Sequence, residues 1–155
     1  MTDRKKQLER GLKRVFPRGF QVAIEMLQKL DPRSREKILS EIKKKDERTF
    51  DILKNNMIVF NDLVYLTPKM VTELLREIKI EQLGVALRAG SREVVDHFLN
   101  NMSTNTKNDL LDLLKGKPRA MSEVEDAQKK IMDVIFRKIE RGEIVIDREG
   151  AKKLV

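Results

Sequence analysis

Apolar residues recur at spacings of three and four along nearly the whole chain, which places their side chains on one face of an α-helix. Most of these stripes are short and are separated by polar residues, glycine or proline. The longest stripe runs from Val124 to Ile139. Only the run Glu143–Ile146 is typical of a strand. The pattern therefore predicts an all-α protein built mainly from short helices.

Several helix ends are marked by residue type. Asp31 and Thr67 are each followed by proline, and such a residue can cap a helix while the proline occupies its first position. Ser122 followed by Glu125 has the form of a capping box, which predicts that the longest helix begins there. Gly142 is expected to end that helix in a left-handed conformation.

An uncharged apolar run, Met57–Phe60, interrupts the helical pattern and is followed at once by Asn61 and Asp62. The run is unusual in a chain in which 37% of the residues are charged. The helical stretches before and after it differ in character. We expect this run, the apolar quartet, to separate two helical parts of the protein.

A faint internal repeat suggests that the helices stack. The pattern L-x-x-x-S-R-E occupies residues 30–36 and again residues 87–93, each time followed by apolar residues at helical spacing. Such a repeat is typical of armadillo-like folds, in which each helical unit buries its apolar face against its neighbour. Stacks of this kind usually serve as interaction surfaces.

The formal net charge of +8 is concentrated near the N-terminus, where residues 1–18 contain seven basic and two acidic side chains. A basic segment can bind nucleic acid or anionic lipid through charge attraction. The same segment has apolar residues at helical spacing and lacks interleaved aromatic residues that could stack on bases. An amphipathic helix with a solvated basic face is therefore the preferred interpretation, and nucleic acid is not an expected partner.

Residues suited to catalysis are scarce. The chain has no cysteine and one histidine, His97, which excludes thiolate metal sites and histidine pairs within one chain. Phosphate-binding glycine motifs, a secretory signal and a run of about 18 apolar residues are all missing from the sequence. We therefore expect a cytoplasmic protein that is not an enzyme, has no cofactor, metal or small-molecule substrate, and carries His97 on a polar helix surface.

Seven motifs nevertheless occur in a recognisable order with matching gaps. They occupy residues 30–32, 57–63, 75–78, 86–88, 98–103, 122–131 and 142–146. This series resembles the bacterial flagellar motor switch protein FliG over about residues 19–150. The resemblance implies a non-enzymatic component of the flagellar rotor and switch complex, which takes part in motility, chemotaxis and the switching of rotation direction.

The resemblance also implies a domain organisation of armadillo-like stacked helices followed by a C-terminal multi-helix domain. The expected parts are a basic N-terminal helical segment, a second armadillo-like unit, a hinge and the C-terminal domain, at residues 1–18, 19–56, 57–62 and 63–155. The hinge residues match the family's M-F-V-F sequence except at the second position, where phenylalanine is usual: Met57, Ile58, Val59 and Phe60.

In the family, charges on the C-terminal domain face the stator of the motor. The resemblance places Arg88, Asp112 and Arg119 among these stator-facing charges. Leu113 stands at the second position of a usual acidic pair, and Asn105 stands where a basic residue is usual. Coupling through exposed charges weakens as charges are lost, so a reduced charged ridge is expected.

The resemblance implies protein partners at the cytoplasmic side of the inner membrane, in the flagellar basal body. These partners are other FliG-type subunits, a FliM-type switch protein and the stator protein MotA. Five apolar residues are candidates for armadillo packing on a neighbouring subunit, or else for the chain's own core: Phe20, Ile24, Leu27, Ile38 and Leu39. The alternative function is an armadillo-like adaptor outside the motor that binds an anionic partner through residues 1–18.

Overall fold

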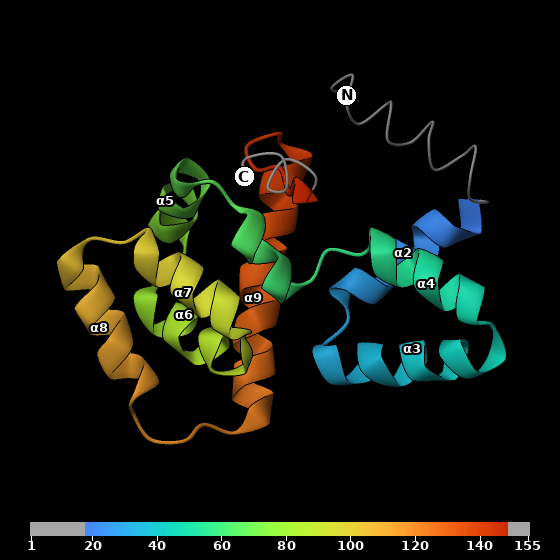
Figure 1. The fold of residues 1–155 in the computed structure, drawn as a ribbon, viewed down its shortest axis with the longest axis horizontal. Coiled ribbons are helices and arrows are strands. Elements are labelled where there is room, and N and C mark those ends of the chain that lie inside the picture. Colours follow the sequence, from blue (N-terminus) through green and yellow to red (C-terminus); the bar gives the residue numbers. More distant parts are fainter. Residues whose placement is uncertain (1–17, 149–155) are drawn as a thin grey trace. The chain divides into compact units, whose positions relative to one another are not determined.

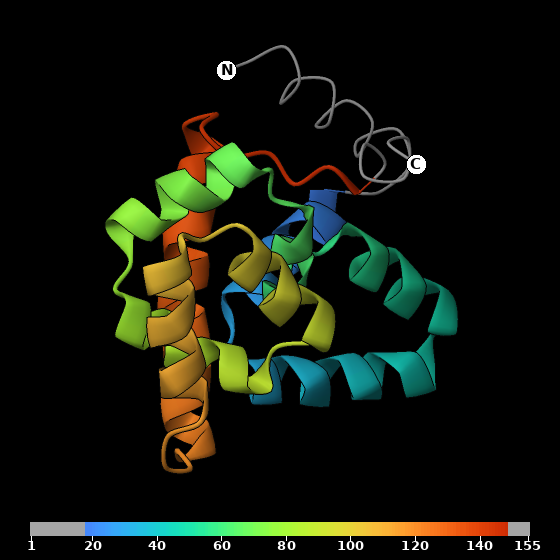
Figure 2. The ribbon, with the colours of Figure 1, turned by 60° about the vertical axis from the view of Figure 1, so that its left-hand side comes forward.

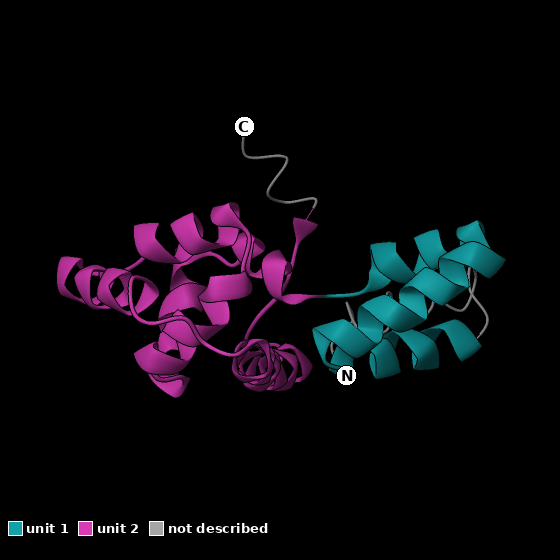
Figure 3. Cartoon of the chain, turned by 90° about the horizontal axis from the view of Figure 1, so that it is seen from below, with its two compact units in different colours: residues 1–58 teal, residues 59–155 magenta. Residues whose placement is uncertain are grey.

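The computed structural model describes residues 18–148, which form helices joined by short connections (Figure 1). The chain divides into two compact units, Met1–Ile58 and Val59–Val155 (Figure 3). The all-α class predicted from the sequence is confirmed, since no strand occurs within residues 18–148. The expected helical segment at residues 1–18 lies outside the described residues except for Arg18, which begins α2.

Within residues 18–58, unit 1 contains three helices, α2 (Arg18–Lys29), α3 (Pro32–Lys45) and α4 (Glu47–Asn56). Helix α4 packs against both α2 and α3. The core of unit 1 is formed by five buried apolar side chains: Ile24, Leu27, Leu39, Leu53 and Met57. The predicted cap of α3 is confirmed, because the Asp31 carboxylate accepts a hydrogen bond from the Ser34 N–H at 3.0 Å.

Within residues 59–147, unit 2 contains the 3-10 helices η1 (Phe60–Tyr65) and η2 (Leu87–Ala89) together with five α-helices. The α-helices are α5 (Pro68–Glu77), α6 (Ile80–Ala86), α7 (Arg92–Asn100), α8 (Thr104–Leu114) and α9 (Met121–Glu140). Helix α6 packs against both α8 and α9, while α7 packs against η1 and α8 (Figure 2). Helices α5 and α6 and the 3-10 helix η2 pack directly against the long helix α9, whose apolar face is buried.

Two predictions about the long helix and the segment after it are wrong. Helix α9 begins at Met121 without a side-chain cap, because the residue before it, Ala120, has no side-chain oxygen that could accept a hydrogen bond. The capping box at Ser122 is therefore not formed.

The predicted strand at residues 143–146 is not formed either, because a strand needs a partner for its backbone hydrogen bonds. The N–H groups of Glu143 and Ile144 instead donate to the Lys138 carbonyl at 2.9 and 3.3 Å. Gly142 has a φ of 74°, so the predicted left-handed stop is confirmed.

Candidate functional site

The first half of the apolar quartet is fixed to unit 1. Met57 is buried, and its N–H continues the hydrogen bonding of α4 by donating to the Leu53 carbonyl at 3.1 Å. The Ile58 N–H donates to Oε1 of Gln28 on α2 at 2.8 Å. Sequence reasoning did not identify Gln28, because a single glutamine on a helix gives no signal of a partner 30 positions away.

The second half of the quartet is fixed to unit 2. Phe60 is buried, and the Val59 N–H donates to Oδ2 of Asp62 at 2.8 Å. Asn61 contacts the start of α7, since its Oδ1 accepts a hydrogen bond from the N–H of Ser91, the residue that precedes this helix, at 2.9 Å. The boundary between the units falls between Ile58 and Val59, which divides the quartet into halves with separate anchors.

Gly90 provides the space in which Phe60 packs. A Cβ atom at Gly90 would lie 3.3 Å from Cε1 of Phe60 and 2.9 Å from Cγ1 of Val94. The φ of Gly90 is −76°, so other residues could adopt this backbone and space alone requires glycine. The linear sequence does not reveal this contact, because Phe60 and Gly90 come together only after folding.

The three predicted stator-facing residues line a single open groove in unit 2. Arg88 follows α6, Asp112 lies on α8, and Arg119 lies in the connection before α9. The groove has a volume of about 730 Å³ and is also lined by charged residues that sequence reasoning missed: Glu81, Asp109, Lys117 and Glu123. This charged groove therefore carries side chains of both signs.

The side chains of Arg88, Asp112 and Arg119 differ in their solvent exposure. Nη2 of Arg88 donates to the Leu113 carbonyl at 3.0 Å, so this half-buried guanidinium caps the end of α8. Arg119 is exposed and forms an ion pair with Glu123 at 3.5 Å. Asp112 is exposed on α8. Arg88, which was predicted only as a stator-facing charge, thus also stabilises the end of α8.

Leu113 occupies a close contact between α8 and α6. A Cβ atom at Gly84 of α6 would lie only 2.9 Å from Cβ of Leu113. A carboxylate at position 113 would be placed against this apolar contact and would lose part of its hydration, which is unfavourable. The packing of α6 against α8 explains why a leucine is suitable where the resemblance suggests an acid.

The apolar residues proposed for armadillo packing fall into two groups. Ile24, Leu27 and Leu39 are buried within the chain, which supports the interpretation that they close its own core. Phe20 is half-buried and Ile38 is 40% exposed. Two further large apolar side chains of α2, which the prediction did not include, are more exposed: Val22 at 49% and Met26 at 65%.

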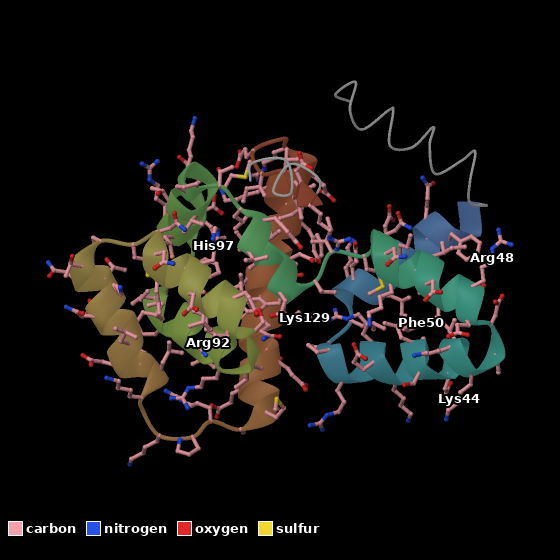
Figure 4. All side chains as sticks on the ribbon, in the orientation of Figure 1. Lys44, Arg48, Phe50, Arg92, His97 and Lys129 are labelled. Carbon is pink, nitrogen blue, oxygen red and sulfur yellow. The ribbon has the colours of Figure 1, made fainter. Side chains whose placement is uncertain are left out.

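His97 does not lie on a free polar surface as predicted. Its Nε2 atom donates to the Leu66 carbonyl at 2.7 Å, and the side chain is half-buried (Figure 4). The bond connects α7 to the end of η1 and gives this histidine a structural partner. Within residues 18–148 there is no cluster of three or more histidine, cysteine or acidic residues suited to a metal ion.

A buried ammonium group, also missed from the sequence, joins three segments of unit 2. Nζ of Lys138 on α9 lies 2.7 Å from Oε1 of Glu77 and 3.1 Å from Oε2 of Glu143. The hydrogen bond to Lys138 lowers the pKa of Glu77, and the hydrogen bond to Glu77 raises the pKa of Lys138 despite burial. The charged forms of both groups therefore stabilise the folded state.

Lys138→Met is expected to lower the melting temperature at pH 7 by roughly 4 °C, because two charge-assisted hydrogen bonds are lost. The contribution of Glu77 is complete above its ordinary pKa of 4.5 and is lost as the pH falls through its lowered pKa. That of Lys138 is complete below 10.5 and is lost as the pH rises through its raised pKa. Thermal unfolding followed by circular dichroism at pH 7 and pH 2 measures the loss of melting temperature and its dependence on the charge of Glu77.

The difference in melting temperature between the Lys138→Met variant and the unmodified chain should therefore be smaller at pH 2, where the glutamates become protonated. Lys130→Met changes an exposed lysine on the same helix and is the matched control. An equal difference at both pH values would show that the ion pairs do not cause the loss.

Comparisons with known proteins agree with this architecture. The family model described as the FliG C-terminal domain matches residues 40–146. The flagellar motor switch protein FliG of Thermotoga maritima is 32% identical, with 97% of this chain and 48% of that protein covered. The protein of the same name from Bacillus subtilis is 28% identical, with 88% and 41% covered. The chain thus spans about half or less of the length of these relatives.

Solved structures show the same fold. The crystal structure of FliG residues 86–343 from Helicobacter pylori has a TM-score of 0.64 and 24% identity, with 93% of this chain and 70% of that chain covered. Full-length FliG from Aquifex aeolicus has a TM-score of 0.54 and 28% identity, with 89% and 44% covered. No helix within residues 18–148 is long and apolar enough to cross a membrane. From the family match and the fold, the chain belongs to the FliG C-terminal domain family.

Proposed function

We propose that this chain is a non-enzymatic component of the bacterial flagellar rotor and switch complex and takes part in motility and rotation-direction switching. Support comes from the family model and from relatives that are named flagellar motor switch proteins. The observation that carries the proposal is the division of the apolar quartet, with Ile58 bonded to α2 and Val59 bonded within η1.

A hinge anchored in this way can move between states without unfolding either unit. The backbone around the boundary is extended, with φ −83° and ψ 145° at Met57 and φ −123° and ψ 170° at Val59. A few residues at an element's end can absorb large dihedral changes while packed units move as bodies. We propose that Met57, Ile58, Val59 and Phe60 form this hinge, and that residues 19–56 and 63–155 act as the parts it joins.

The charged groove is the proposed surface toward the stator. Asp112 and Arg119 are exposed there, whereas Arg88 acts mainly by holding the end of α8. Exposed charges of this kind couple to passing charges over about 10 Å at physiological salt. The proposed partner at this surface is the stator protein MotA, and the coupling is weaker than that of a ridge with more charges.

Other FliG-type subunits and a FliM-type switch protein are the further proposed partners, at the cytoplasmic side of the inner membrane. Ile38 of α3 and the α2 residues Val22 and Met26 present apolar surface suited to contact with another subunit. Buried Ile24, Leu27 and Leu39 would support that surface from within. The adaptor outside the motor gains no support from the family match, and most of its basic segment lies outside the described residues.

Deleting the gene is expected to impair swimming or direction reversal, and the purified chain is expected to bind a motor switch protein. Within a complemented strain, Asp112→Lys should reduce swimming speed because it reverses an exposed charge in the groove, while its effect on stability stays within about 0.5 kcal/mol. Tracking of swimming cells and thermal unfolding of the purified variant measure the two effects.

Asp133→Lys makes the same charge change at an exposed position of α9 that does not line the groove. It should leave swimming unchanged. Normal swimming, reversal and flagellar assembly in the deletion strain would contradict the proposed function as a whole. Normal swimming of Asp112→Lys alone would contradict only the stator-facing role of the groove.

A further inference from the structure

The segment that follows α9, residues 143–148, is held to unit 2 at three points and is termed the C-terminal strap. At its start, Oε2 of Glu143 accepts a hydrogen bond from buried Nζ of Lys138 at 3.1 Å. The next side chain, Ile144, is buried. At its end, Nη2 of Arg148 lies 2.7 Å from Oδ2 of Asp62. The strap therefore runs from the end of α9 to the start of η1.

The carboxylate that receives Arg148 is also the one that holds the hinge backbone. Oδ2 of Asp62 accepts hydrogen bonds from Arg148 and from the Val59 N–H, at 2.7 and 2.8 Å. The two residues of the ion pair are 86 positions apart in the chain, and their side chains are only 14% exposed for Asp62 and 33% for Arg148. A pair shielded to this degree is screened less by salt than an exposed pair.

The position of Asp62 explains why its orientation matters. Val59 precedes the first residue of η1, and a carboxylate three positions later that bonds this N–H forms one half of a capping box. The backbone bond from the Asp62 N–H to the Val59 carbonyl, at 2.9 Å, closes the same turn. Any change of dihedral angles at Val59 large enough to move the hinge must break or rearrange these bonds.

We propose that the C-terminal strap is a latch on the hinge, in which Arg148 positions the Asp62 carboxylate that fixes Val59. The inference rests on the proposed function only in that it treats the apolar quartet as the hinge. With the ion pair formed, the start of η1 is held and the hinge keeps one conformation. With the pair broken, Asp62 can rotate away, and Val59 is free to change its backbone angles. Arg148 is thus a positioning residue that acts on the hinge through Asp62.

Amide hydrogen exchange of Val59, measured by NMR on the full chain, tests the latch directly. Arg148→Gln removes the ion pair without touching Val59, and it should speed exchange of the Val59 N–H about three- to tenfold. Asp62→Ala removes both bonds and should speed exchange at least as much. Arg148→Lys retains the charge and should restore part of the protection. Lys129→Gln, an exposed lysine of α9, removes one positive charge elsewhere and should leave Val59 unchanged (Figure 4).

The amide of Leu83 is the control for general loosening of unit 2, because Leu83 is fully buried and its N–H donates to the Lys79 carbonyl. In Arg148→Gln its exchange should stay as in the unmodified chain. Equal acceleration at Val59 and Leu83 would overturn the latch and indicate general destabilisation. Unchanged Val59 exchange in Arg148→Gln, with acceleration in Asp62→Ala, would also overturn it, because Asp62 would then hold the hinge without the strap.

The exchange measurement uses only the purified protein, so it is separate from the test of motor function. Faster Val59 exchange in Arg148→Gln together with altered direction reversal in cells would support both proposals. Faster exchange with normal reversal would support the latch and count against the motor role of the hinge. Unchanged exchange would overturn the latch whatever the swimming behaviour of the strain.

Discussion

Phe60→Ala is expected to lower the free energy of unfolding of unit 2 by about 3–4 kcal/mol, since it removes a buried aromatic side chain and leaves a cavity. The cavity forms where Phe60 packs beside Gly90, so neighbouring atoms can fill it only by moving η1 or the start of α7. We also expect loss of direction reversal, because the second half of the hinge loses its apolar anchor. Urea denaturation and tracking of swimming cells measure the two results.

A matched variant separates hinge damage from loss of stability. Leu74→Ala removes a fully buried side chain of α5 in the same unit and should cost about 2–4 kcal/mol without changing the quartet. At a temperature where both variants remain folded, only Phe60→Ala should alter reversal. Equal motility of the two variants would argue that Phe60 has no role beyond the core.

Gly84→Val is expected to lower the free energy of unfolding by about 2–3 kcal/mol, because it places new atoms where two helices are already in contact. The Cβ atom alone would lie 2.9 Å from Cβ and 3.3 Å from Cδ1 of Leu113. Helix α8 must then move away from α6, and the charged groove changes shape with it. Urea denaturation measures the loss, and swimming speed reports its effect on the groove.

Two controls test the cause. Gly19→Val makes the same change in α2, where a Cβ atom would meet nothing within 4 Å, and it should not destabilise the protein. Leu113→Ala combined with Gly84→Val should cost less than the sum of the two single changes, because the smaller side chain makes room. Full additivity in this double-mutant cycle would show that the clash with Leu113 is not the reason for the loss.

The helical fold was accessible from the sequence because its signals are local. Asp31 and Thr67 cap the helices that follow them, with hydrogen bonds of 3.0 and 3.2 Å, as their pairing with proline predicts. The same local logic was wrong at Ser122, where the helix starts earlier and the residue lies in its first turn. The run of β-branched residues within 143–146 also led to a wrong prediction, because whether such a run forms a strand depends on a partner that local sequence does not show.

Predictions about individual sites were less complete because they concern residues far apart in the chain. The quartet was located from composition, but the groups that hold it, Gln28 and Asp62, were not assigned this role. Arg88 was identified as a charge, yet its guanidinium bonds the backbone at Leu113, 25 positions away. The ion pair of Lys138 with Glu77 likewise joins α9 to α5, two helices that are separated in the chain by α6, α7 and α8.

The order of the helices, the position of the quartet and the family resemblance follow from the linear chain, because apolar spacing, caps and motif order are encoded within a few turns of helix. The division of the quartet between Ile58 and Val59, the use of Arg88 as a cap, and the convergence of Arg148 and Val59 on one Asp62 oxygen appear only in the folded protein. Hydrogen bonds and close contacts act over a few ångströms in space, and folding alone brings such distant positions that close.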